Sequence, residues 1–314
     1  MPAPKCLIID PMHPSLFAML QEIGWEYDYK PEIARAAVKT SHIGYQGIIV
    51  RSKTSIDREL LGSSPTVKFI GRAGAGLDKL DLPYLSEKKI AVIHASEGNR
   101  DAVGEHAMGL LLALVRNIVK ADQEVKKMVW AREANRGGEI MGKTVGIIGY
   151  GNTGRAFARR LSGFGCNVLA YDRYKRNFSD DFCKEADMEA IFSQSEILSL
   201  HIPLTDETRM LVDLNYFKRF KKPIILINTA RGEIVSLTAV DKALIEGYLR
   251  GAALDVLENE KLDTLTASQI EAFNSLREKS NVIFTPHIAG WTFESHVKIN
   301  VALVQKISAL QLAQ

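Results

Sequence analysis

A glycine-rich loop between two apolar runs constrains this chain more than any other feature. The run 145–148 leads into Gly149, Gly151 and Gly154, a helix-like segment follows, and a second apolar run ends at Asp172. A strand, a glycine turn, a helix, a strand and an acid in this order form the fingerprint of a dinucleotide-binding unit. The chain is therefore expected to contain a parallel sheet with helices on both faces.

Each glycine of the loop has its own physical task. Gly149 permits the tight turn, Gly151 lets the backbone approach a pyrophosphate, and Gly154 lets the helix lie close to the strand. The amides of Asn152 and Thr153 open the helix, where unpaired N–H groups and the helix dipole favour phosphates. The loop therefore predicts a dinucleotide cofactor.

The acid at the end of the second run indicates which dinucleotide is bound. Asp172 stands 18 residues after Gly154, where a carboxylate accepts from both ribose hydroxyls and repels a 2′-phosphate. This favours NAD over NADP. Arg173 beside it keeps the NADP alternative open, because a guanidinium could hold a 2′-phosphate.

Length, charge and cysteine content limit the remaining possibilities. A chain of 314 residues suits two domains, and a net charge of +3 with interspersed bases gives no electrostatic support for nucleic-acid or membrane partners. Cys6, Cys166 and Cys183 share no metal or redox spacing, so we expect no metal site and a reduced, cytoplasmic location. Residues 1–10 do not resemble a signal peptide, and the most apolar stretch, 108–115, is too short to span a bilayer.

Short apolar runs separated by helix-like segments recur along the whole chain. Continuous β-branched runs are typical of parallel strands that are buried on both faces. The other runs lie at 6–9, 47–50, 67–70, 91–93, 197–200, 224–227, 252–256 and 282–284. They predict two doubly wound α/β domains, with one long helix from about 101 to 128 between them and a last helix at about 294–312.

Three polar residues follow strands in the second half of the chain, where open parallel sheets bind ligands. Arg231 can clamp a substrate carboxylate in fork geometry, and His287 can exchange a proton with a C2 oxygen. Glu260 can stabilise the charged histidine, although Glu258 nearby is an alternative. Together with a dinucleotide loop, these groups are typical of hydride transfer to or from a 2-hydroxy acid.

The chain resembles the D-isomer-specific 2-hydroxyacid dehydrogenases over essentially its full length. The matching segments are 71–78, 99–106, 149–154, 201–205, 228–232, 253–256 and 286–290. The resemblance implies that Arg231, Glu260 and His287 form the catalytic set. Lys261 departs from the family pattern, which usually has proline at that position.

The resemblance also implies a discontinuous arrangement of domains. Residues 1–98 plus 289–314 would form a flavodoxin-like substrate-binding domain, and residues 99–288 a Rossmann-like NAD-binding domain. The active site would lie in an interdomain cleft, and the chain would assemble as a homodimer through its cofactor domain.

Further ligand contacts follow from the same resemblance. Besides the loop residues and Asp172, the implied NAD contacts are His201, Pro203, Thr208, Thr229, Ala230, Asp255 and Gly290. The implied substrate contacts are Arg51, Ser52, Lys53, Gly74, Ala75, Gly76, Asn99 and Arg231.

The substrate is expected to be a small 2-hydroxy or 2-oxo acid. Within the family, segments 50–54 and 71–78 are most similar to D-3-phosphoglycerate dehydrogenases of serine biosynthesis. Arg51, Lys53 and Arg72 follow strands and together could neutralise a phosphate. Two alternatives remain open, namely a glyoxylate or hydroxypyruvate reductase and, more remotely, an NAD-sensing protein similar to transcriptional co-repressors.

Overall fold

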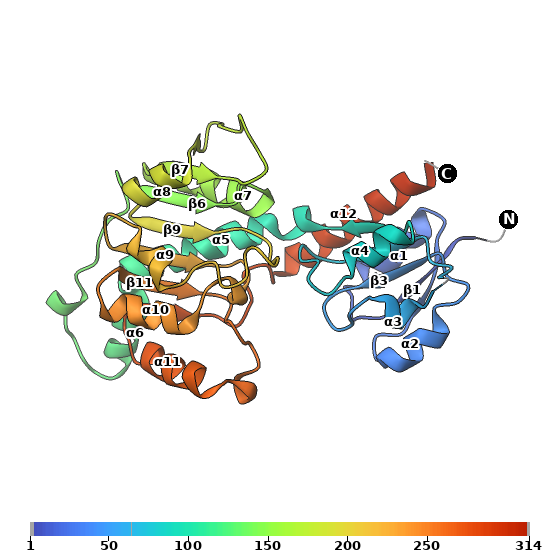
Figure 1. The fold of residues 1–314 in the computed structure, drawn as a ribbon, viewed down its shortest axis with the longest axis horizontal. Helices are drawn as coiled ribbons and strands as arrows, with labels where there is room; N and C mark the ends of the chain where they lie inside the picture. Colours follow the sequence, from blue (N-terminus) through green and yellow to red (C-terminus); the bar gives the residue numbers. More distant parts are fainter. Residues whose placement is uncertain (1–2, 64, 313–314) are drawn as a thin grey trace. The chain divides into compact units, whose positions relative to one another are not determined.

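The computed structural model describes residues 3–63 and 65–312. Among these residues the chain forms two compact units (Figure 1). Unit 1 runs up to Arg100 and resumes at Trp291, and unit 2 comprises Asp101–Gly290. The domain boundaries predicted after residue 98 and before residue 289 lie close to these positions.

Unit 1 is a five-stranded parallel sheet covered by helices. The strand order is β2-β1-β3-β4-β5, which is the doubly wound pattern that the sequence predicts. The strands are β1 Lys5–Ile8, β2 Glu26–Tyr29, β3 Gly47–Val50, β4 Phe69–Arg72 and β5 Ala91–His94. The helices are α1 Ser15–Glu22, α2 Arg35–Ser41, α3 Arg58–Leu61, α4 Leu82–Glu87 and α12 Phe293–Leu312.

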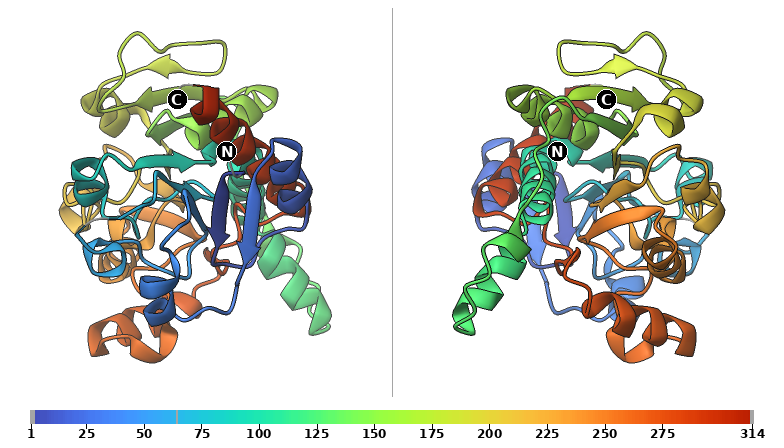
Figure 2. Two further views of the ribbon diagram at one scale, coloured as in Figure 1. Left: turned by 90° about the vertical axis from the view of Figure 1, so that its right-hand side faces the viewer. Right: turned by 90° about the vertical axis from the view of Figure 1, so that its left-hand side faces the viewer.

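Both faces of this sheet are apolar, which explains the continuous apolar runs. Cys6 and Ile8 of β1 belong to one buried cluster, and Leu7 belongs to the other. The C-terminal helix α12 completes the first cluster with Ile299 and Leu303 and packs beside α1, as Figure 2 shows. The end of the chain thus contributes to the core of the first unit.

Unit 2 is a seven-stranded parallel sheet in the order β12-β11-β10-β9-β6-β7-β8. The strands are β6 Thr144–Ile148, β7 Asn167–Tyr171, β8 Lys184–Glu185, β9 Ile197–Leu200, β10 Ile224–Asn228, β11 Leu249–Leu254 and β12 Val282–Phe284. The α-helices are α5 Ser96–Val115, which begins in unit 1, α6 Ile118–Lys126, α7 Asn152–Leu161, α8 Met188–Gln194, α9 Leu214–Lys218, α10 Leu237–Ile245 and α11 Ala267–Arg277. The order reverses between β6 and β9, so ligand-binding loops are expected beyond the carboxyl ends of these two strands. The predicted doubly wound α/β class is confirmed.

The prediction of one helix from 101 to 128 is wrong. Helix α5 ends at Val115 and α6 begins at Ile118, because Asn117 adopts a left-handed conformation with φ of 54°. Asparagine tolerates this conformation better than most residues, and the Asn117 amide also donates to the carbonyl of Arg136 at 3.3 Å. Apolar spacing predicts which face is buried and does not reveal such a break.

Two short edge strands also escaped the sequence analysis. Strand β2 is half-exposed and polar, and β8 has only two residues, so neither contains a continuous apolar run.

Among the described residues, no single helix is long and apolar enough to cross a membrane. Helices α5 and α6 taken together, bent by 62°, meet the requirements of length and composition.

Candidate active site

The glycine loop lies between β6 and α7, at the reversal of strand order in unit 2. Gly149 has a φ of 92°, and a Cβ there would lie 2.5 Å from the carbonyl oxygen of His201. A Cβ at Gly154 would collide with the carbonyl of Gly149. Gly151, in contrast, faces open space, since a Cβ there would meet no atom within 4 Å. Protein contacts thus require two of the glycines, and the open third matches the close approach of a pyrophosphate to the helix that begins at Asn152 and Thr153.

Asp172 follows β7 and is held in place by backbone amides. One carboxylate oxygen accepts from the Tyr150 amide of the glycine loop at 2.9 Å, and the other accepts from the amides of Tyr174 and Lys175 at 3.0 and 3.1 Å. Arg173, the residue that could hold a 2′-phosphate, is ion-paired with Glu207 at 2.9 Å. The geometry therefore favours a ribose with free hydroxyls at this position.

The loop after β9 carries three of the predicted cofactor contacts. His201 Nε2 is 2.9 Å from the Ser199 hydroxyl, whereas its Nδ1 is buried without a partner among the described residues. Desolvation lowers the pKa of His201 to about 3, so the ring is neutral. Thr208 donates its hydroxyl hydrogen to the Pro203 carbonyl at 2.8 Å and so closes this loop.

The turn after β10 presents Arg231. Buried Asn228 organises this turn, because its side chain accepts from the Ala230 amide at 3.1 Å and donates to the Arg231 carbonyl at 3.1 Å. Gly232 is required, since a Cβ there would overlap the Leu257 carbonyl. The Thr229 hydroxyl oxygen is buried without a partner among the described residues, which leaves it available to a ligand at the same strand end.

His287 and Glu260 form a hydrogen-bonded pair in unit 2. The His287 Nδ1 atom lies 2.8 Å from a carboxylate oxygen of Glu260, and both side chains are about half exposed. The hydrogen bond that His287 donates to Glu260 raises the pKa of His287, partly opposed by burial and by the charge of Arg231. Because Nδ1 is engaged, Nε2 is the nitrogen free to exchange a proton with a substrate.

The structure distinguishes the two candidate carboxylates. Glu258 accepts from the Leu237 amide at 2.9 Å and from the Gln269 side chain at 2.8 Å, at the beginnings of α10 and α11. Its role is therefore to position two helices. Of the two glutamates, Glu260 is the one that contacts His287, although Lys261 follows it where the family usually has proline.

Asp255 holds the loop that carries His287 in place through hydrogen bonds. Its buried carboxylate accepts from the amides of Ile288 and Ala289 at 2.9 Å each and from the Thr285 hydroxyl at 2.6 Å, and its carbonyl accepts from the His287 amide at 2.7 Å. Burial acts to raise the pKa of Asp255, but these bonds and one from His106 together lower it. These contacts explain how His287 holds a left-handed φ of 57°.

Two members of this network, His106 and Thr285, were not predicted from the sequence. His106 Nε2 lies 3.0 Å from the Thr285 hydroxyl and 3.4 Å from Asp255, although the residues are far apart in the chain. His106 belongs to a family-like segment, 99–106, but its pairing could not be read from spacing.

We expect a Glu260→Gln substitution to shift the pH dependence of activity. Reduction of a 2-oxo acid needs protonated His287, so its rate falls as the pH rises through the pKa of this residue. Loss of the Glu260 charge lowers that pKa, and the falling limb moves to lower pH. A pH profile of kcat/KM for reduction measures the shift. Glu258→Gln is the matched control, and a limb that stays in place in both variants would contradict the pairing.

The predicted substrate residues of unit 1 divide into two groups. Arg51 follows β3 and lines a small pocket with Met12, His13, Ala73, His296, Ile299 and Asn300. Lys53 does not line it, because its amine donates to the carbonyls of Pro31 and Ile33 at 2.7 and 3.4 Å, and Ser52 accepts from Lys79 through its carbonyl. The prediction that Lys53 shares an anion with Arg51 therefore has no support in unit 1.

Two further substrate candidates lie near β4 and β5. Gly74, the first residue of the segment Gly74–Ala75–Gly76, has a φ of 148°, and its carbonyl accepts from the Ala95 amide at 3.0 Å. The Asn99 side-chain oxygen is buried without a partner among the described residues. Its free acceptor is therefore available to a ligand.

Comparison with known proteins identifies the family. Residues 108–289 match the model of the D-isomer specific 2-hydroxyacid dehydrogenase, NAD binding domain. The D-3-phosphoglycerate dehydrogenase of Archaeoglobus fulgidus is 33% identical over 305 residues, which is 96% of this chain and 56% of that protein. The chain thus spans little more than half the length of this relative.

Two other relatives match over most of both chains. The hydroxypyruvate reductase of Thermotoga maritima is 35% identical over 260 residues, 83% of each chain. The crystal structure of D-lactate dehydrogenase from Aquifex aeolicus, complexed with NAD and lactic acid, superimposes with a TM-score of 0.82 at 28% identity and covers 98% of this chain and 96% of that chain. The chain therefore belongs to the D-isomer specific 2-hydroxyacid dehydrogenase family, and it carries the family's NAD-binding domain.

Proposed function

We propose that this chain is an NAD-dependent oxidoreductase that interconverts a D-2-hydroxy acid and the corresponding 2-oxo acid. The observation that carries the proposal is the His287–Glu260 pair at 2.8 Å, in the same unit as a glycine loop with open space beside Gly151. An acid–base histidine and a dinucleotide loop are the two elements that hydride transfer at an alcohol carbon requires.

Each residue of unit 2 then has a defined task. Arg231 binds the substrate carboxylate and, through its planar fork, orients C2. His287 removes the hydroxyl proton during oxidation and returns it during reduction, and Glu260 stabilises the imidazolium that results. When bound, NAD(H) accepts or supplies the hydride. Thr229 and the amides at the start of α7 would hold the cofactor.

For the substrate we propose D-3-phosphoglycerate, whose oxidation is a step of serine biosynthesis. The supporting observations are the Arg51 guanidinium in its unit 1 pocket and the similarity to the Archaeoglobus protein. Glyoxylate or hydroxypyruvate reduction is the second candidate, favoured by the Thermotoga relative, which this chain matches over most of its length.

Initial rates of NADH oxidation with phosphohydroxypyruvate, hydroxypyruvate and glyoxylate distinguish these candidates. A preference for the phosphorylated acid that is lost in Arg51→Ala supports the phosphoglycerate assignment. A preference for an unphosphorylated acid supports the reductase. NADH binding without turnover of any of the three acids would refute both and favour an NAD-sensing protein.

We expect Asp172→Ala to relax the choice of cofactor. The substitution removes the carboxylate that accepts from ribose hydroxyls and repels a 2′-phosphate, so the KM for NADH should rise about tenfold or more, while the activity with NADPH increases. Steady-state rates with both cofactors measure the ratio of the two kcat/KM values. An unchanged ratio would contradict the assignment of Asp172.

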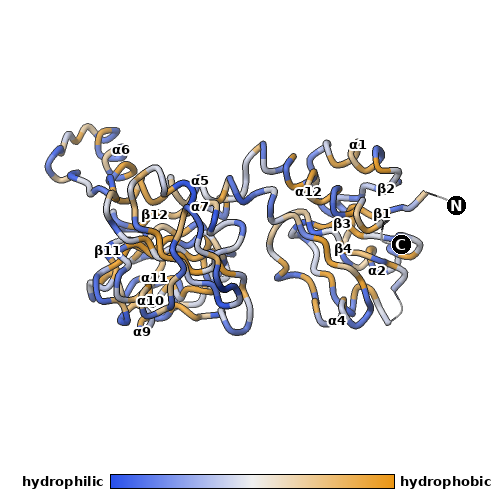
Figure 3. The backbone as a smooth tube through the Cα atoms, turned by 90° about the horizontal axis from the view of Figure 1, so that it is seen from above, coloured by the Kyte–Doolittle hydropathy of each residue, from blue (hydrophilic) through white to orange (hydrophobic). Residues whose placement is uncertain are grey.

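We also propose that the chain forms a homodimer. Helix α6 has no buried residue, and together with the chain that follows it projects from the rest of unit 2 (Figures 2 and 3). The exposed apolar residues of this region are Ile118, Val119, Val125, Met128, Val129, Trp130 and Met141. An apolar patch of this kind is typical of a protein interface. Sedimentation equilibrium should show twice the 34.8 kDa chain mass, and a monomer would refute the proposal.

A further inference from the structure

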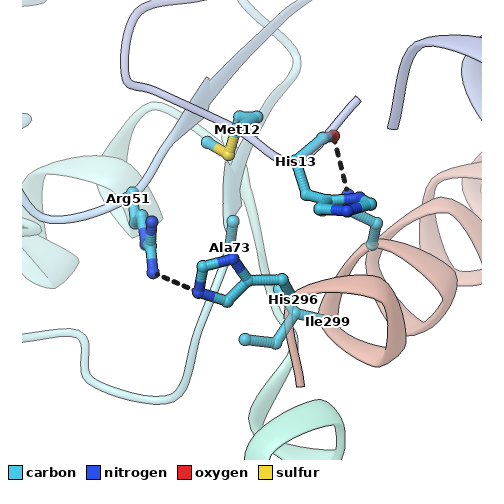
Figure 4. Close-up of a pocket in the computed structure, with 7 residues that line it drawn as sticks. Met12, His13, Arg51, Ala73, His296 and Ile299 are labelled. Atoms are coloured by element: carbon cyan, nitrogen blue, oxygen red, sulfur yellow. Dashed lines mark hydrogen bonds between the residues drawn. The ribbon is translucent and has the colours of Figure 1, made fainter. Parts of the chain in front are cut away.

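One arginine and two histidines line the pocket of unit 1 (Figure 4), and a tryptophan packs against the arginine. The Arg51 guanidinium carbon lies 3.8 Å from the ring centroid of Trp291, and Arg51 Nη2 lies 3.1 Å from His296 Nε2. His13 and Trp291 both approach the His296 ring edge-on, with centroids at 6.4 and 4.9 Å. Residues 245 positions apart in the chain, Arg51 and His296, thus meet in one site.

The Arg51 side chain makes no ion pair in residues 3–63 and 65–312. Asp10 is the nearby carboxylate, but one of its oxygens accepts from the backbone amides of Arg51 and Lys53 at 2.6 and 3.1 Å. It therefore fixes the chain after β3 instead of binding the guanidinium. A half-buried guanidinium that lacks a carboxylate partner has donors available for an anion.

His296 is the unexpected partner of this cation. A guanidinium can only donate, so His296 Nε2 must accept and must carry no proton. Burial lowers the pKa of His296, and the charges of Arg51 and His13 lower it further. His296 also lies in the first turn of α12, where the helix dipole opposes a cation and favours an anion.

The groups that face His296 come from three segments of unit 1. His13 comes from the chain between β1 and α1, Arg51 follows β3, and Asn300 lies on α12 itself. Asn300 is buried and donates to the His13 carbonyl at 3.2 Å, which ties the two histidine-bearing segments together. Asp10 acts on Arg51 and does not reach His296 by any hydrogen bond of the described residues.

We propose that Arg51 and His296 together recognise a dianionic phosphate monoester, and that His296 takes up one proton from solvent when this anion binds. In the free site His296 accepts from Arg51. An anion between them needs donors on both sides, so the protonated ring becomes a second donor while Arg51 turns its N–H groups to the phosphate. This inference rests on the proposed function and names His296 as a residue that determines specificity.

Proton uptake predicts a particular pH dependence. Between pH 7 and 8.5 a phosphate monoester remains a dianion, so only His296 changes its charge on binding. Affinity should then fall by up to about tenfold for each pH unit, because each bound anion takes up one proton. The ratio of kcat/KM for phosphohydroxypyruvate to that for hydroxypyruvate isolates this effect, since both reactions share His287, Glu260 and NADH.

The test compares this ratio in three proteins. In the wild type and in His13→Gln the ratio should fall steadily from pH 7 to 8.5, and in His296→Gln, where the amide oxygen can still accept from Arg51, it should be flat. A flat wild-type ratio would overturn the proposal. Loss of the slope in His13→Gln with retention in His296→Gln would also overturn it, because the proton would then belong to His13.

A binding measurement separates this inference from the proposed function. Calorimetric titration of the full chain with inorganic phosphate at about pH 8.5, where the free phosphate is already a dianion, in two buffers of different ionisation enthalpy, counts the protons taken up without any turnover. Uptake that approaches one proton in the wild type and is absent in His296→Gln supports the anion site even if no 2-oxo acid is reduced. Absence of uptake, or of phosphate binding, overturns it even if the enzyme is active.

Discussion

The His287→Ala variant is expected to lose about 10³-fold or more in kcat while it retains NADH binding. Positioned acid–base catalysis contributes typically 10² to 10⁴-fold, and Nε2 of His287 is the proton-exchanging atom left free by the bond to Glu260. The glycine loop and Asp172 do not depend on this side chain. Fluorescence titration with NADH and steady-state reduction rates measure the two quantities separately.

His287→Asn provides the matched control for backbone effects. His287 has a φ of 57°, a conformation that asparagine adopts more readily than alanine. If the loss comes from proton transfer, both variants should lose activity to a similar extent. Recovery of most activity in His287→Asn, or a loss of tenfold or less in both, would show that His287 does not transfer the proton.

The Arg231→Lys variant is expected to lose roughly 10² to 10³-fold in kcat/KM, with contributions from both constants. Lysine retains the positive charge but cannot form two parallel hydrogen bonds to a carboxylate, so C2 is no longer held in the reactive orientation. The turn itself should remain, because it is organised by Asn228 and Gly232 and not by the guanidinium.

Two further measurements assign that loss to the guanidinium. Arg277→Lys, on the exposed surface of α11, should leave kcat/KM unchanged. Addition of free guanidinium to Arg231→Ala should restore part of the activity, with a dependence on guanidinium concentration. If Arg231→Lys retains nearly full activity, the carboxylate is bound elsewhere.

Local patterns predicted much of this molecule because they report directly on local constraints. The apolar run 145–148 corresponds to β6, and Gly154 is required by a contact that lies close in sequence, with the carbonyl of Gly149. Polar residues that follow buried strands share one edge of a parallel sheet, so Arg231, Glu260 and His287 could be proposed before any coordinates were known.

Where local signals were weak or ambiguous, the sequence analysis was incomplete or wrong. Strand β2 has no apolar run because it lies at an edge, and the break at Asn117 has no signature in the hydrophobic pattern. Glu258 and Glu260 have similar local surroundings in the sequence, and only the positions of α10 and α11 show that Glu258 is already engaged.

The fold class, the dinucleotide loop and the residue types at the strand ends could thus be predicted without coordinates. The pairings could not, including which carboxylate contacts His287 and which side chain contacts Arg51. This difference follows from the distance along the chain over which each interaction acts. Strand periodicity acts between near neighbours in the chain, whereas the bond from Arg51 to His296 joins residues 245 positions apart, which only the packing of α12 on the first sheet brings together.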